Sequence, residues 1–296
     1  MKWPKEKYEK YTLEVNTYLD ACLPKQGSSP QILHEAMHYA VKNGGKRIRP
    51  LLTYASAETL SIDPLLLTPT AAAIELLHCF SLVHDDLPCM DDDDLRRGRP
   101  ATHKAFGEAT AVLAADALIS LAFEILGSDS SFNGTKEINA SLVTLIANAT
   151  GSRGITGGQA LDLYAEGLIL DQSELEHIYR QKTGKLLRAC ILSPCCFIDV
   201  GLKKTAALER YIDAIGLAFQ IKDDIIEAEG KTEEIGKSSH SDINQKKATF
   251  PKTFGLSHSK KRVNHLLHNA KDALSIFGKD AEPLISMAEI IVSRRL

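Results

Sequence analysis

Helical periodicity extends over nearly the whole chain and is the strongest constraint on its fold. In long segments rich in Ala and Leu, apolar residues recur at steps of three and four, the spacing that places them on one face of an α-helix. The clearest segments are residues 71–83, 109–126, 136–149, 172–192, 206–229 and 281–294. No segment shows the sustained alternation that would indicate strands. The sequence therefore predicts an all-α fold, a single large helical bundle of about ten or more helices.

Polar or glycine-containing breaks separate these segments. The shorter breaks fall at residues 26–30, 61–69, 127–135 and 151–158. A longer break at residues 230–247 is unusual for a simple connector, and we interpret it as a flap. A chain of 296 residues is long enough for one large domain or two. We treat residues 1–296 as one domain.

Composition excludes several classes of function. The formal net charge is −3 and no basic tract is interleaved with aromatic residues, so nucleic acid is not an expected partner. The six cysteines lack zinc-ligand spacing and are expected to be reduced, mostly buried thiols. The N-terminus lacks the apolar core of a signal peptide, and Asp116 and Glu124 interrupt the apolar run 112–126. We expect a soluble, cytoplasmic protein without membrane insertion.

Two acidic clusters far apart in the chain indicate what it binds. They comprise Asp85, Asp86 and Asp91 in the first cluster, and Asp223, Asp224 and Glu227 in the second. Carboxylates at this density repel one another unless cations lie between them. Oxygen-only ligand sets suit Mg²⁺, which keeps coordination positions open for phosphate oxygens. The clusters therefore predict two helices that face each other across a cavity and hold a polyphosphate.

The second cluster has helical spacing. Gln220, Asp223, Asp224 and Glu227 stand at i, i+3, i+4 and i+7, along one helix face. The alternative is an ordinary solvated acidic face, which the apolar neighbours of these residues disfavour.

The first cluster follows the helix 71–83, on which His78 and Asp85 share a face. Pro88 should end this helix near Asp86, after which the chain returns Asp91 toward the site. Residues 92–94 are expected to cap or solvate the start of the next helix.

Basic residues accompany both clusters. Arg96 and Arg97 directly follow the first, and arginine is suited to two-pronged phosphate contact, although a local salt-bridge network is the alternative. Lys46, Arg47 and Arg49 surround a glycine turn and form a weaker candidate anion site. Further cations lie at residues 182–185, 236–237 and 246–247.

From Gly44 to the C-terminus the chain resembles the trans-type (head-to-tail) isoprenyl diphosphate synthases, the polyprenyl synthetase family. The two acidic clusters resemble its two aspartate-rich motifs, the first in its bacterial and plant form. Further matches are the segments at residues 45–50, 157–159, 182–183 and 219–220, and the lysines of the break 230–247. One departure is Glu227, where the family usually has Asp.

The resemblance implies an isoprenoid synthase bundle with a central substrate cavity, and roles for individual residues. Three Mg²⁺ ions would be bound by Asp85, Asp86, Asp91, Asp223 and Asp224. The allylic diphosphate would be contacted by Arg96, Lys182, Gln220, Lys237 and Lys247, with Thr183 over the allyl chain. Isopentenyl diphosphate would be held by Lys46, Arg49, His78 and Arg97. The residues most directly tied to catalysis would be Asp85, Asp86, Arg96, Lys182, Asp223 and Lys237.

The implied reaction is ionisation, condensation and elimination. Metal ions and cations draw charge onto the leaving diphosphate, isopentenyl diphosphate attacks the allylic cation, and a proton leaves to the departed diphosphate. Closure of the break 230–247 would exclude water. The resemblance also implies a homodimer.

Product length is expected to depend on the residues that close the bottom of the pocket below Asp85. Ser81 is one turn deeper and Phe80 about 7.5 Å deeper at helical rise. A phenyl ring at this position resembles bacterial farnesyl diphosphate synthases, which favours a C15 product from dimethylallyl and geranyl diphosphate. The alternatives are a C20 geranylgeranyl product, a non-catalytic prenyltransferase subunit and a terpene cyclase.

Overall fold

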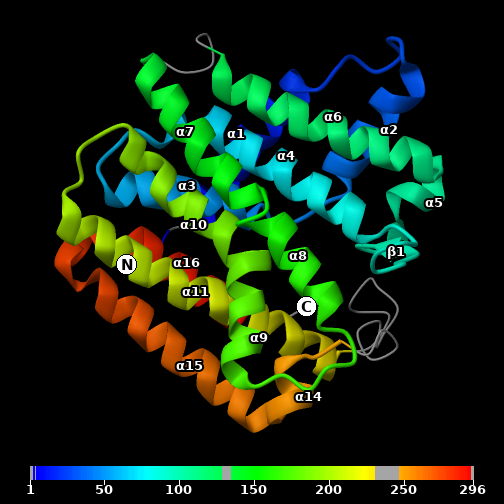
Figure 1. The fold of residues 1–296 in the computed structure, drawn as a ribbon. Helices are drawn as coiled ribbons and strands as arrows, with labels where there is room; N and C mark the ends of the chain where they lie inside the picture. Colours follow the sequence, from blue (N-terminus) through cyan, green and yellow to red (C-terminus); the bar gives the residue numbers. More distant parts are fainter. Residues whose placement is uncertain (1–2, 4, 129–134, 231–246, 295–296) are drawn as a thin grey trace.

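A computed structural model describes residue 3 and residues 5–128, 135–230 and 247–294, and over these the protein is a bundle of α-helices (Figure 1). The helices in chain order are α1 (Lys5–Cys22), α2 (Gln31–Lys42), α3 (Ile48–Thr59), α4 (Thr68–Asp85), α5 (Thr102–Phe106), α6 (Glu108–Gly127), α7 (Lys136–Thr150), α8 (Ile155–Tyr164), α9 (Gln172–Tyr179), α10 (Lys185–Leu192), α11 (Leu202–Glu229), α14 (Phe250–Phe254), α15 (Leu256–Ala273) and α16 (Glu282–Ser293). Short 3₁₀ turns are η1 (Pro64–Leu67), η3 (Ser193–Cys196) and η4 (Leu274–Ala281). The predicted all-α fold is confirmed.

Two long helices, α4 and α11, carry the acidic clusters through the middle of the bundle. Helix α4 packs against α3 and α6, and α11 packs against α10, α15 and α16 (Figure 1). Most of α4 is buried, which suits a helix that is apolar on nearly every side. At 28 residues α11 is about 42 Å long, so it can reach from the core to the edge of the bundle.

Strands were not expected, and the structure corrects this at one place. Leu95–Arg96 (β1) and Arg99–Pro100 (β2) form a two-stranded antiparallel ladder, in which Arg96 is opposite Arg99. The two residues between them, Arg97 and Gly98, both have positive φ, at 54° and 75°. Positive φ at both central residues is the requirement of a type I′ hairpin turn. Two-residue strands are too short to produce an alternating pattern.

The segment 172–192, expected to be one helix, is interrupted. Helix α9 leads into a π-helical turn, η2 (Arg180–Gly184), and then into α10. Single π-turns within helices often occur at functional sites. Hydrophobic periodicity does not reveal such a turn, because the apolar stripe resumes on its far side.

Two of the predicted breaks are shorter than expected. Helix α4 begins at Thr68 and takes Pro69 into its first turn, where a missing N–H costs no helical hydrogen bond. Helix α8 begins at Ile155, inside the break expected at 151–158.

The six cysteines are free thiols, as expected, but fewer are buried than predicted. Cys79 and Cys190 are buried and Cys89 is exposed, and the remaining three are partly exposed.

Within the described residues, two helices are long and apolar enough to cross a membrane by length and composition. The two helices are residues 64–85 and 108–127. The expectation that Asp116 and Glu124 exclude the second helix from this class is therefore wrong. The first is 83% buried within the protein, which identifies a core helix. The second, α6, is only 39% buried and leaves an apolar face exposed.

Candidate active site

The first acidic cluster is built on the end of α4. The helix ends at Asp85, with Asp86 as its C-cap, close to the end predicted from Pro88. The chain then turns back, and the backbone N–H of Asp91 donates to the carbonyl of Asp85 at 2.8 Å. This hydrogen bond places Asp91 beside the end of the helix.

The β1–β2 hairpin positions Arg96 against this cluster. The Arg96 Nε donates to Asp86 Oδ1 at 2.9 Å, and its Nη2 contacts Asp86 and, at 3.3 Å, Asp93. Residues 92–94 were expected to cap or solvate the next helix start; capping is wrong, because α5 has no side-chain cap, but Asp92 and Asp94 are exposed to solvent. Instead Asp93 is buried against Arg96, and the exposed Asp94 pairs with Lys104 at 2.7 Å. Arg96 therefore takes part in a local salt-bridge network, which was the alternative to a phosphate contact. The phosphate contact of Arg96 stays a prediction.

Two lysines connect the first cluster to α8 and η2. Lys247 Nζ lies 2.7 Å from Asp91 Oδ1, and Lys182 Nζ lies 2.7 Å from Asp162 Oδ2. Lys247 is also 3.9 Å from Asp162, so the two lysines share this carboxylate.

The charges of this group shift one another's pKa. Burial raises the pKa of Asp85 to about 6, Lys182 opposes this rise and Asp91 adds to it. Burial by itself lowers the pKa of Lys182, but the carboxylates of Asp162 and Asp85 outweigh burial and raise it. Lys182 is therefore a cation at neutral pH.

The second cluster lies on α11 and differs in its partners. Asp223 Oδ1 accepts from Arg294 at 2.7 Å. Asp224 is buried and accepts hydrogen bonds from the Tyr179 hydroxyl and from the Phe250 backbone N–H, the latter at 2.9 Å. Its other oxygen accepts from Gln220 at 3.2 Å. Asp224 thus ties α11 to α9 and α14.

The turn η2 brings Thr183 to this helix. The Thr183 hydroxyl donates to Gln220 Oε1 at 2.7 Å, which continues the chain of hydrogen bonds to Asp224. Helix α8 supports η2 from behind at Gly158, where a Cβ would lie 2.2 Å from the Lys182 backbone nitrogen. Only glycine allows this approach without a shift of the backbone.

A third group of polar residues lies where α3, α4 and the hairpin meet. Burial lowers the pKa of Arg49, and burial together with Arg49 and Arg97 holds the pKa of His78 well below its usual range. Arg97 donates to the carbonyl of Gly44, and a Cβ on Gly45 would lie 2.5 Å from its guanidinium.

Arg47 has a structural role in the same loop. It has φ 48° and donates to Glu75 at 2.7 Å and to the Val41 carbonyl at 2.9 Å. This buried ion pair positions the chain between Lys46 and Arg49. The Arg49 Nε is buried and has no hydrogen-bond partner among the described residues, and a bound anion would supply an acceptor for it.

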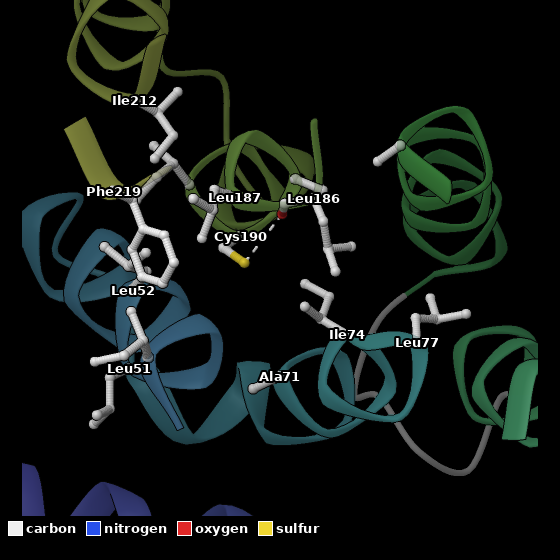
Figure 2. Close-up of a cluster of buried hydrophobic side chains, with 14 of the residues drawn as sticks. Leu51, Leu52, Ala71, Ile74, Leu77, Leu186, Leu187, Cys190, Ile212 and Phe219 are labelled. Carbon is white, nitrogen blue, oxygen red and sulfur yellow. Dashed lines mark hydrogen bonds between the residues drawn. The ribbon is translucent and has the colours of Figure 1, made fainter. Parts of the chain in front are cut away.

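Apolar side chains occupy the space between α3, α4, α10 and α11. Figure 2 shows these side chains pointing toward one another, with α4 contributing Ala71, Ile74 and Leu77 and α11 contributing Ile212 and Phe219. Both helices run from this apolar region to their acidic clusters. The expected central cavity remains a prediction. The two cavities described, of about 570 and 250 Å³, lie between η2, α11 and α15 and near η3–η4.

The expected floor residues lie on α4 before Asp85. Phe80 is buried, its ring centroid 5.7 Å from that of His84 in an edge contact, and Ser81 is buried with its hydroxyl bonded to the His78 carbonyl. At about 100° per residue, Ser81 is about 40° around the helix from Asp85 and Phe80 about 140°.

The described residues test whether the site suits a divalent cation. Among them no three acidic, histidine or cysteine side chains already converge as a metal cage. Mg²⁺ is usually bound through one or two carboxylates together with substrate phosphates, so such a cage is not required. Asp85, Asp86, Asp91 and Asp223 offer the oxygen ligands, three of them contacting protein cations that a metal ion and a diphosphate could replace. The donor set fits Mg²⁺.

Sequence reasoning missed Asp162, Tyr179, Phe250 and Arg294. Asp162 follows the glycines at 157–158 and could have been noticed as the carboxylate of that segment. Arg294 carries no signal in the sequence, since basic residues near a C-terminus are ordinary. Lys237 and most of the predicted flap lie outside the described residues.

Comparisons with known proteins agree with this geometry. The profile of the polyprenyl synthetase family matches residues 30–278. The farnesyl diphosphate synthase of Haemophilus influenzae is 42% identical over 98% of each chain. The large subunit of an Arabidopsis thaliana heterodimeric geranylgeranyl pyrophosphate synthase is 40% identical over 95% of this chain and 76% of that protein. A Helicobacter pylori geranyltransferase structure complexed with magnesium and isoprenyl diphosphate aligns with a TM-score of 0.83 at 30% identity, over 97% of this chain and 95% of that one.

Proposed function

The chain belongs to the polyprenyl synthetase family of prenyltransferases, which elongate isoprenyl chains head to tail, and we propose that it makes farnesyl diphosphate. The substrates would be isopentenyl diphosphate with dimethylallyl and then geranyl diphosphate. The observation that carries this proposal is the arrangement of α4 and α11. Each helix runs from the apolar core to a cluster of aspartates beside protein cations.

Members of the family depend on Mg²⁺, and we propose three ions per active site. Asp85, Asp86 and Asp91 would hold them from α4, and Asp223 with Asp224 from α11. Bound Mg²⁺ would neutralise charge on the allylic diphosphate and so make it a better leaving group.

The basic side chains that neutralise the carboxylates would bind the diphosphate when it is present. Arg96, Lys182 and Lys247 each contact an aspartate at 2.7–2.9 Å. When metal ions neutralise the acidic groups, these side chains become donors for the diphosphate oxygens. Gln220 and Lys237 are proposed to join them as contacts of the diphosphate, and Thr183 to lie over the allyl chain.

Isopentenyl diphosphate would bind to the group around Arg49. Lys46, Arg49 and Arg97 supply positive charge, and His78, with its lowered pKa, would bind as a neutral imidazole. The double bond would attack the allylic carbocation, and a proton would then leave to the released diphosphate. Each cycle converts one allylic diphosphate and one isopentenyl diphosphate into an allylic diphosphate that is five carbons longer, and releases diphosphate, which takes the proton.

The homodimer and the cytoplasmic location are also proposals. Leu113 is 58% and Val112 38% exposed on α6, so this apolar helix presents a face that a second copy would cover. Bacterial relatives of this kind are soluble enzymes.

The test is a product assay with purified protein, Mg²⁺, dimethylallyl diphosphate and excess isopentenyl diphosphate. Dephosphorylated products are sized by chromatography, and a farnesol peak is expected. A geranylgeraniol peak would support the proposed reaction but overturn the proposed C15 product length. Absence of any product would favour a non-catalytic subunit, and a cyclic hydrocarbon from the allylic diphosphate alone would favour a cyclase.

Variants test the acidic clusters in the same assay. Asp85→Asn and Asp223→Asn are each expected to lower kcat by at least about a hundredfold, since each removes a charge that stabilises the transition state through the metal. Asp94→Asn is the matched control, because Asp94 follows the first cluster but is exposed and pairs with Lys104. Near-normal turnover in either cluster variant would overturn the proposed metal roles.

A further inference from the structure

Arg294 is a cation of the site that the proposed reaction does not use. Arg96, Lys182 and Lys247 neutralise carboxylates, and their side chains are expected to bind the allylic diphosphate when metal ions neutralise those carboxylates. Arg294 instead follows the end of α16, near the C-terminus, and reaches Asp223 on α11.

Three contacts hold the Arg294 guanidinium on α11. Its Cζ lies 3.8 Å from the centroid of the Phe219 ring, and its Nη2 donates to the Phe219 carbonyl at 2.8 Å. Nη2 also lies 2.7 Å from Asp223 Oδ1. Phe219 precedes Asp223 by one helical turn, so the ring and the carboxylate are on the same face. The Arg294 side chain is 12% exposed and that of Asp223 43%.

This arrangement places a fixed positive charge where a divalent cation would bind. A cation approaching Asp223 meets an oxygen already bonded to the guanidinium, together with repulsion from the guanidinium charge. The stacking on Phe219 and the bond to its carbonyl do not depend on Asp223, so Arg294 stays nearby when the ion pair opens. A lysine could not reproduce the planar stack together with the two hydrogen bonds.

We propose that Arg294 is a resident counter-ion of Asp223 and competes with the divalent cation for this carboxylate. The second acidic cluster would then bind its cation weakly until a diphosphate supplies further negative charge. Arg294 is thus a positioning residue that acts through Asp223 and orders cation binding after the diphosphate. The inference rests on the proposed metal role of Asp223.

The test is a titration of the ligand-free enzyme with Mn²⁺, followed by the electron paramagnetic resonance signal of free Mn²⁺. In Arg294→Gln the Mn²⁺ dissociation constant is expected to fall about fivefold, the size of a direct ion-pair coupling. Arg294→Lys is expected to lie between Gln and the wild type. Saturating inorganic diphosphate should reduce the difference between Arg294→Gln and the wild type to less than about twofold.

A double-mutant cycle with Asp223→Asn separates direct competition from a general charge effect. If Arg294 acts through Asp223, the Arg294→Gln change has no effect on Mn²⁺ binding in the Asp223→Asn background. An equal effect in both backgrounds, or an unchanged dissociation constant in Arg294→Gln itself, would overturn the inference. If Asp223→Asn leaves Mn²⁺ binding in the presence of diphosphate unchanged, the proposed metal role of Asp223 fails instead. Circular dichroism and the thermal midpoint confirm that each variant is folded.

Discussion

The aspartates of the site differ in the partners that the described residues give them. Asp86 contacts a guanidinium and Asp91 an ammonium, whereas Asp224 is bonded by the neutral donors of Tyr179, Phe250 and Gln220. The hydrogen bonds from Tyr179 and Phe250 to Asp224 join α11 to α9 and α14. Aspartates that are adjacent in the sequence can therefore have different partners, as Asp223 and Asp224 do.

Phe80 supports a prediction about product length. Phe80→Ala removes a buried ring five residues before Asp85, and the space gained should let the chain grow to C20 or longer. Chromatography of dephosphorylated products measures this. Ser81 lies closer to the face of Asp85, so Ser81→Phe is the reciprocal variant and is expected to shorten the product. An unchanged C15 product from Phe80→Ala would show that another residue floors the pocket.

His78 supports a prediction about pH. Burial, Arg49 and Arg97 hold its folded-state pKa well below the value of about 6.5 found in unfolded chains. The unfolded state therefore binds a proton as the pH falls through about 6.5 while the folded state does not, and stability is lost in that direction. In urea unfolding at pH 7.5 and pH 5, His78→Gln should lose less stability than the wild type.

His265, an exposed histidine on α15, provides the control. His265→Gln should show the wild-type loss between the two pH values. An equal loss in His78→Gln and the wild type would contradict the burial argument.

At the scale of elements, the turn η2 decides the geometry around Lys182 and Thr183. A regular helix from α9 to α10 would place these side chains at different angles around the axis. Three contacts from two helices hold the π-turn. Asp162 on α8 bonds Lys182, Gly158 on α8 packs against the backbone, and Gln220 on α11 bonds Thr183. One inserted residue thus directs two adjacent side chains to two neighbouring helices.

Gly158→Ala tests this support. Its Cβ would lie 2.2 Å from the nitrogen and 2.4 Å from the Cα of Lys182, so η2 must move. We expect a loss of about 1–3 kcal/mol in the free energy of unfolding and a fall in kcat of about tenfold or more. Gly127→Ala on α6 is the control, because a Cβ there meets nothing within 4 Å. Wild-type kinetics in Gly158→Ala would mean that the position of η2 does not matter for catalysis.

At the scale of the whole molecule, α6 is the apolar helix that the bundle covers least. One face packs on α4, while Val112 and Leu113 remain exposed on another. Exposed apolar residues gathered on one long helix are typical of an interface.

Leu113→Asp should therefore separate the proposed homodimer into monomers, because it buries a charge in the interface. Light scattering after size-exclusion chromatography measures the mass. Leu202→Asp is the control, because Leu202 is 90% exposed and lies at the start of α11. A dimer that persists in Leu113→Asp, or a wild-type monomer, would contradict the assignment of this face.

The sequence by itself determined the all-α fold and the position of the first acidic cluster at a helix end. Both follow from local rules, namely periodicity along the helix and the effect of Pro88 on its continuation. The family was also recognisable from its ordered motifs, and the comparisons confirm it.

Only the tertiary structure decided which partner each charged residue has. Arg294 contacts Asp223 and Lys247 contacts Asp91 across separations of 71 and 156 residues, and such pairs depend on how helices pack rather than on local spacing. The hairpin β1–β2 and the turn η2 were missed for a related reason. Each is only a few residues long, too short for a periodic pattern, and each is stabilised by contacts with distant helices.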